Sequence, residues 1–250
     1  MKTLFSFLLL TVVNLVALAD CAGSGIYVWP KTSEISENPV ITVEGYYSDQ
    51  KIIRSIEKEY HLYLKSEHQL VRLKLIEVLE GQMDLTQIVL KPLKQLTDGV
   101  KYELCAFSTP KSPSSLPVEY ELNIPNTKWT VKALNDKTNP IFEQQPQLTG
   151  STVIYYGCGP SNFMNFAYAT NETTAYLIRT TVTNIEDESS ITYYLPANGK
   201  GELSVGHGMC SGAFTPILGV KYKIEFSLLD GSWNKSKTVS CEVVYNPEQG

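Results

Sequence analysis

The sequence predicts an all-β protein with two antiparallel β-sandwich domains in tandem. The chain has 15 tyrosines and many valines, threonines and isoleucines, a composition that favours strands over helices. Short segments alternate apolar and polar residues with a period of two, and polar, Gly-rich or Pro-rich stretches separate them. The sequence Gly-Val-Lys-Tyr occurs at 99–102 and again at 219–222, and this wide spacing indicates two similar units.

Residues 1–19 have the pattern of a secretory signal peptide. Lys2 precedes an apolar run from Leu4 to Val16, and Ala17-Leu18-Ala19 offers the small residues that signal peptidase prefers. The run is shorter than the roughly 20 apolar residues of a spanning helix, so we expect no transmembrane segment in the mature chain. The protein is therefore expected to be exported, to the periplasm, the cell surface or the medium.

The first domain is predicted to cover residues 25–125. Tyr60 to Leu64 and Val71 to Leu75 alternate on either side of the polar tip KSEHQ, which predicts a hairpin. Residues 48–59 and 76–97 are the stretches that allow a short helical turn. Strands elsewhere in this domain are expected to be short.

The second domain is predicted to cover residues 126–250. Prolines and the sequence KSPSS in the stretch 110–127 mark the boundary. After the second Gly-Val-Lys-Tyr, the segment 221–228 alternates strictly, with Tyr222, Ile224, Phe226 and Leu228 on one face, as in a half-buried strand. The segment 238–245 alternates in the same way.

Two tyrosines are expected to serve the fold. Tyr102 and Tyr222 each begin a late strand, where the ring can fill the core while the hydroxyl caps backbone at the neighbouring corner. A spaced pattern, LxPxxxLxxGxxYxL, includes the first of them, and its residues are Leu90, Pro92, Leu96, Gly99, Tyr102 and Leu104.

This pattern resembles the penultimate hairpin of bacterial Ig-like domains, including those appended to envelope proteins. The resemblance implies an Ig-like sandwich for residues 25–125 and, because the second unit keeps only Gly219 and Tyr222, a divergent Ig-like sandwich for residues 126–250. Members of this group include adhesive, spacer and copper-carrying proteins, so the resemblance implies no particular ligand.

The five cysteines predict one disulfide in the second domain. Cys158 in YYGCGPSN and Cys210 in GHGMCSG are both flanked by glycines, and an oxidising compartment favours their pairing. An odd number leaves at least one cysteine unpaired or modified. Cys241 alternates with inward residues and is expected to be a small buried hydrophobe.

Two cysteines stay unassigned. Cys105 lies on the face opposite Tyr102, and it is either free or bridged to Cys21. Cys21 follows the apolar run at the place of a lipid anchor, although Asp20 before it is a poor fit to the small residue that such processing prefers.

His207, Met209 and Cys210 form the candidate site for chemistry. Their soft ligand atoms suit copper(I), which gives the hypothesis of a periplasmic copper-binding protein. Cys210 or Cys158 with His207 as base gives a second hypothesis, a thiol hydrolase, which requires base and nucleophile within hydrogen-bond reach.

The prediction that we favour is a non-catalytic binding or spacer protein. A net charge of −5 is unsuited to nucleic acid, and motifs such as GxSxG or HExxH do not occur. We therefore expect no enzyme activity and no cofactor, with an envelope protein or a glycan as partner. Aromatic residues offer contact area for such a partner, and those considered are Trp29, Tyr46, Tyr47, Tyr60 and Tyr63.

Overall fold

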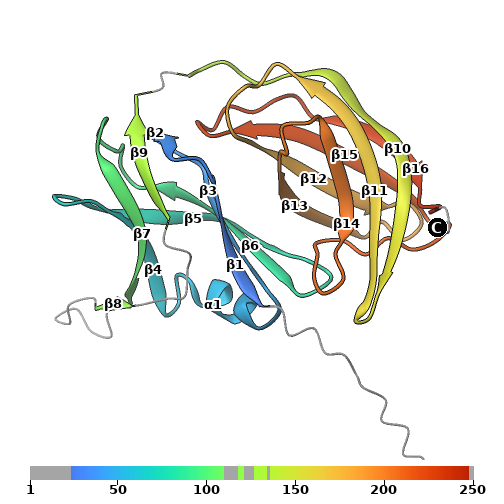
Figure 1. Ribbon diagram of the computed structural model, residues 1–250, viewed down its shortest axis with the longest axis horizontal. Coiled ribbons are helices and arrows are strands. Elements are labelled where there is room, and N and C mark those ends of the chain that lie inside the picture. Colours follow the sequence, from blue (N-terminus) through green and yellow to red (C-terminus); the bar gives the residue numbers. More distant parts are fainter. Residues whose placement is uncertain (1–23, 110–117, 121–126, 134–135, 248–250) are drawn as a thin grey trace, which may run out of the picture.

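The computed structural model describes residues 24–109, 118–120, 127–133 and 136–247. The predicted signal peptide, Cys21 and most of the expected linker lie outside these residues. The chain is an all-β sandwich protein, as predicted, and Figure 1 shows its strands gathered in two halves. Among the described residues, no helix has the length and apolar character needed to cross a membrane.

The first half is one continuous sheet folded into two layers, in the order β1-β3-β6-β5-β4-β7-β9-β2, with β8 paired to β7. The fold-over lies in β5, which pairs with β4 through Leu70 to Arg72 and with β6 from Leu73 onward. The helical elements are η1 (Tyr47–Asp49) and α1 (Gln50–Ser55). The strands are β1 (Gly25–Trp29), β2 (Glu34–Ser36), β3 (Ile41–Tyr46), β4 (Tyr60–Lys65), β5 (Leu70–Glu80), β6 (Leu85–Pro92), β7 (Lys101–Ser108), β8 (Glu119–Tyr120) and β9 (Lys128–Lys132).

The second half is a sandwich of two separate sheets, β10-β11-β14 and β13-β12-β15-β16. All of its strand pairs are antiparallel. The strands are β10 (Phe142–Tyr156), β11 (Gly159–Thr170), β12 (Tyr176–Asn184), β13 (Ser190–Pro196), β14 (Glu202–His207), β15 (Lys221–Asp230) and β16 (Val239–Val244).

The two halves repeat one strand order. The row β1-β3-β6 corresponds to β10-β11-β14, and β5-β4-β7-β9 corresponds to β13-β12-β15-β16. Each Gly-Val-Lys-Tyr sequence leads into the equivalent strand, β7 or β15. This is the sequence of strands that gives a Greek-key sandwich.

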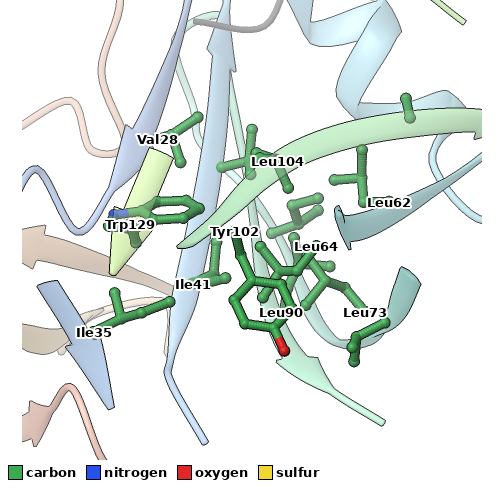
Figure 2. Close-up of a cluster of buried hydrophobic side chains, with 14 of the residues drawn as sticks. Val28, Ile35, Ile41, Leu62, Leu64, Leu73, Leu90, Tyr102, Leu104 and Trp129 are labelled. Atoms are coloured by element: carbon green, nitrogen blue, oxygen red, sulfur yellow. The ribbon is translucent and has the colours of Figure 1, made fainter. Parts of the chain in front are cut away.

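Each half buries a hydrophobic core of its own. In the first half, Tyr102 and Trp129 lie among the aliphatic side chains of both layers (Figure 2). In the second, Phe166 from β11 meets Phe226 from β15 edge to face, with ring centroids 5.3 Å apart. The inward residues predicted for the segment 221–228 are all buried.

One local expectation is confirmed and one is wrong. The helical turn expected within 48–59 is α1, and the hairpin with the KSEHQ tip is β4 and β5. Residues 76–97 hold no helical turn but the end of β5 and all of β6. The sequence of β6 does not alternate between apolar and polar residues, because Thr86 to Leu90 are buried on both faces of the strand.

β9 lies beyond the expected division at 125/126, yet it belongs to the first half. It pairs in parallel with β2 and antiparallel with β7, and Trp129 and Val131 are in the first core. A division of the chain by its sheets therefore falls after Lys132.

Candidate functional site

The segment GHGMCSGAF lies in the second half, where it contacts a turn of the first half. β14 ends at His207, and the chain turns back so that Gly208 N–H donates to Ser211 O at 2.9 Å. Gly212 N–H donates to Met83 O at 2.7 Å, and Met83 N–H donates to Gly212 O at 3.1 Å. Gln82 N–H donates to the carbonyl of the next residue, Ala213, at 2.9 Å. The segment therefore binds the turn between β5 and β6.

His207 is buried, with 4% of its surface exposed, and both ring nitrogens have protein partners. Asn162 Nδ2 donates to Nε2 at 2.9 Å, and Nδ1–H donates to the carbonyl of Gly208 at 2.7 Å. Asn162 Oδ1 accepts from the hydroxyl of Tyr245 at 3.2 Å. This network favours a structural role for His207, because a metal on Nε2 would displace the amide of Asn162.

Two positions of the segment require glycine because neighbouring backbone lies too close for a side chain. Gly206 has φ +155, and a Cβ there would collide with the carbonyl of Asn162 on β11. A Cβ on Gly212 would collide with the backbone and Cβ of His207. The glycines thus allow β14 and the returning chain to lie against their neighbours.

The structure brings the turns that carry Cys158 and Cys210 together. Cys158 lies in the turn between β10 and β11, and the neighbouring Gly159 approaches the carbonyl of Met209. Cys210 is disulfide-bonded. Cys105 and Cys241 are free thiols, and the pairing of Cys210 with Cys158 stays a prediction.

The surroundings of Cys105 and Cys241 hold both thiols protonated. Burial, followed by the nearby carboxylate of Glu119, raises the pKa of the Cys105 thiol to about 12. Burial also raises the pKa of Cys241, which packs against the second core. Neither sulfur is suited to nucleophilic chemistry, because the thiolate is the reactive form.

The two fold tyrosines occupy equivalent corners. Tyr102 Oη accepts from Thr97 N–H at 3.2 Å, and Tyr222 Oη accepts from Ile217 N–H at 3.0 Å. The glycine of each Gly-Val-Lys-Tyr is left-handed, with φ +73 at Gly99. Both rings are buried, so these hydroxyls satisfy backbone donors at the edge of each core.

A polar contact between the halves was not predicted. Gln87 on β6 lies against β13, where its Oε1 accepts from Tyr194 N–H at 2.8 Å and its Nε2 donates to Tyr194 O at 3.0 Å. Nε2 also donates to Glu44 Oε2 at 3.1 Å. The one sequence signal for this contact is that Gln87, a polar residue, directly precedes the apolar run Ile88 to Leu90. Nothing in the sequence around Tyr194, 107 residues away, indicates the contact.

An apolar cluster and an ion pair lie beside the contact of Gln87 with Tyr194. Together these three features form the junction between the two halves. The buried cluster draws on both halves and contains Trp29, Val40, Val89, Leu177, Tyr194 and Leu229. Beside it, Arg179 Nη2 lies 3.0 Å from Glu77 Oε1, and Tyr194 Oη donates to Glu77 Oε2 at 3.2 Å. The ion pair is partly exposed and adds specificity more than stability.

Two cavities, of about 490 and about 460 Å³, lie on the two sides of Trp29. The first is lined by Tyr27, Glu44 and Lys31 from the first half and by Pro196 and its neighbours from the second. The Tyr27 ring is 46% exposed and stacks on Tyr46 at 5.4 Å. Tyr27 was not among the aromatic residues predicted as a contact surface. Of those, Trp29 lines the cavity, whereas Tyr60 and Tyr63 lie on β4 in the other layer.

Burial raises the pKa of Glu44 at the floor of the first cavity, and the hydrogen bond from Gln87 and the charge of Lys31 oppose the shift. Lys31 Nζ lies 5.0 Å from the centre of the Tyr27 ring. The cavity thus combines an apolar wall with a hydrogen-bond acceptor, the carboxyl group of Glu44, and a positively charged donor, the ammonium group of Lys31.

Three carboxylates meet beside the second cavity. Oxygens of Asp136, Glu172 and Asp230 lie within 4.8 Å of one another, an arrangement of the type that a hard cation uses. The oxygens of Asp230 already accept from the backbone of Ser232 and from the backbone and side chain of Asn234. Asp230 therefore orders the turn after β15.

No family model matches the chain, and no curated protein matches it. Solved structures to which the chain has a weak similarity include a two-domain fibronectin type-III segment of chicken tenascin, with 12% identity, 88% of this chain and 97% of that chain covered, and a TM-score of 0.25. The fibronectin(III)-like modules of Clostridium thermocellum CbhA match at 12% identity, with 89% and 95% covered and a TM-score of 0.26. Likenesses this weak carry no argument about ligand or activity, and the fold assignment rests on the sheets themselves.

Proposed function

We propose that the protein is an exported, non-catalytic module that binds or spaces components of the cell envelope or the extracellular medium. The observation that carries the proposal is the junction at Gln87 and Tyr194, which supports a rigid body made of two sandwiches. Joined domains move relative to one another by default unless their interface is large and apolar. Here a buried apolar cluster and paired backbone groups at Met83 and Gly212 both oppose such motion.

The ligand is proposed to contact the cavity beside Tyr27. Its partly exposed ring offers contact area at low entropic cost. The opposite charges of Glu44 and Lys31 offset each other, which favours a neutral polar ligand, such as a glycan or a peptide backbone, over a charged one. Both halves contribute to the wall, so a rigid junction preserves its shape.

Relaxation of backbone ¹⁵N nuclei tests the rigid body. We expect amides of both halves to give one rotational correlation time. Two distinct correlation times would contradict the proposal. A screen of neutral oligosaccharides and uncharged peptides then tests binding, with Tyr27→Ala expected to weaken it and Leu218→Ala, at an exposed side chain outside the cavity and outside β10, as the control.

The alternatives give different results in the same sample. Stoichiometric copper that is lost in His207→Ala would replace this proposal by the metal-binding one. Labelling of Cys158 by a thiol-directed activity probe faster than in the denatured chain would replace it by the hydrolase one. The disulfide of Cys210 belongs to the proposal as a structural element of an exported protein.

A further inference from the structure

β10 is a long strand at the edge of its sheet. The order β10-β11-β14 leaves its outer side without a hydrogen-bonded strand among the described residues, and β16 of the other sheet comes close to part of it. From Gly150 to Tyr156 it pairs with β11 without any register shift, whereas shifts interrupt the pairing before Gly150. The last seven residues of β10 therefore present a regular row of backbone donors and acceptors, which is a template for another strand.

The side chains of this stretch do nothing to block such pairing. No charged residue occurs from Gln144 to Tyr156, and the single proline, Pro146, precedes the regular part. Ile154 is 47% exposed and Tyr156 is 51% exposed. Threonine, valine, isoleucine and tyrosine are the residues that pair well across strands.

Other edges in the described chain are covered, short or charged. The backbone of β13 is bonded by Gln87 of the first half. β16 carries Glu242, which is paired with Lys221 at 2.6 Å. β2 has three residues and β1 five, and β14 begins with a glutamate. These are the devices by which proteins protect sheet edges, and the end of β10 has none of them.

We propose that two copies of this chain pair antiparallel through β10, with the two-fold axis at Val153. Residues opposite each other in an antiparallel pair are both hydrogen-bonded or both not, so the axis must fall on a residue. Val153 is the middle of the regular stretch Gly150 to Tyr156.

This register is self-complementary. It places Thr152 opposite the partner's Ile154, a pair of β-branched side chains, and Tyr156 opposite the partner's Gly150, where an aromatic ring covers a glycine. Because the stretch carries no charge, no like charges meet across the axis. A second copy satisfies the edge with a closed, isologous contact, and the sheets β14-β11-β10 of both copies become one.

The length of the paired strands determines the dissociation constant that we expect for the dimer. Seven residues of antiparallel strand span about 24 Å. A contact of this kind is smaller than a standard stable interface, so the dimer is expected to dissociate in the micromolar range. The pairing is independent of the proposed ligand and of the rigid junction.

Sedimentation velocity over about 1 to 200 µM tests the pairing. We expect the wild-type chain to pass from monomer to dimer and Ile154→Lys to raise the dissociation constant at least tenfold. Ile217→Lys, at a similarly exposed isoleucine away from β10, should leave it unchanged. A wild-type chain that stays monomeric, or two lysine variants that associate alike, would overturn the proposal.

A charge exchange tests the register itself. Thr152→Glu alone should also dimerise weakly, but a mixture of Thr152→Glu and Ile154→Lys should associate at least tenfold more tightly than either variant alone, because the new charges face each other across the axis. A mixture no tighter than its components would overturn the axis at Val153. Circular dichroism confirms that each variant is folded, and both replaced side chains are exposed.

Discussion

The side-chain amide of Gln87 is bonded to the backbone of Tyr194 by both of its ends, with Oε1 accepting at 2.8 Å and Nε2 donating at 3.0 Å. A side chain of β6 thus gives β13 the two hydrogen bonds that a neighbouring strand would give. Both residues are buried, so the backbone groups of Tyr194 lose their protein partners if the amide is removed.

Gln87→Ala is expected to destabilise the whole protein. The substitution leaves the N–H and C=O of Tyr194 buried without partners, which costs about 2 to 4 kcal/mol of unfolding free energy. Urea unfolding measures this cost. Gln144→Ala, on the exposed side of β10, is the matched control and should change stability by less than about 0.5 kcal/mol. Equal costs for the two variants would show that the junction contributes little.

Phenylalanine at the two corner tyrosines should have similar but unequal effects. Tyr222→Phe removes the acceptor of Ile217 N–H and is expected to cost about 1 kcal/mol. Tyr102→Phe should cost more, because its hydroxyl also donates to Gln69 Oε1 at 3.2 Å. The double variant should show the sum of the two costs if the chain unfolds in one transition. A Tyr222→Phe variant as stable as wild type would contradict the role given to this hydroxyl.

Alkylation should sort the cysteines by environment. Cys105, with a pKa of about 12, and Cys241, with its pKa raised by burial, should react with iodoacetamide at pH 8 only after denaturation. Cys210 should react only after reduction. Rapid labelling of Cys105 in the native chain would contradict the burial described. Peptide mapping then identifies the partner of Cys210: a link to Cys158 is the sequence prediction, and a link to Cys21 would replace it.

Glu44→Gln should change how stability depends on pH. The pKa of Glu44 is raised above its usual 4.5, mainly by burial, so the folded protein binds this proton more tightly than the unfolded chain. Wild-type stability contributed by Glu44 therefore falls as pH rises from 4.5 through the raised pKa, and then stays level. The variant lacks this loss. Its stability relative to wild type should increase with pH across that window in denaturant titrations, and a constant difference would contradict the assignment.

The sequence predicts best the elements that keep one face in water. β15 alternates apolar and polar residues, and its buried face was read correctly from Tyr222 to Leu228. β6 could not be predicted in this way, because the second half covers its outer face and removes the alternation. The contact that GHGMCSGAF makes with the first half could not be predicted from the sequence either. Its glycines and His207 indicate a constrained segment, but the Met83 turn that it binds is far away in the chain.

The junction also decides how the chain can be divided. A fragment ending after β9 would expose the outer face of β6 at Val89 together with Trp29 and Val40, all of which are now covered by the second half. Such contiguous apolar surface promotes aggregation. The complementary fragment would expose Leu177 and Leu229, and the amide and carbonyl of Tyr194 would become an open strand edge. Each sandwich has a core of its own, but its solubility depends on the other.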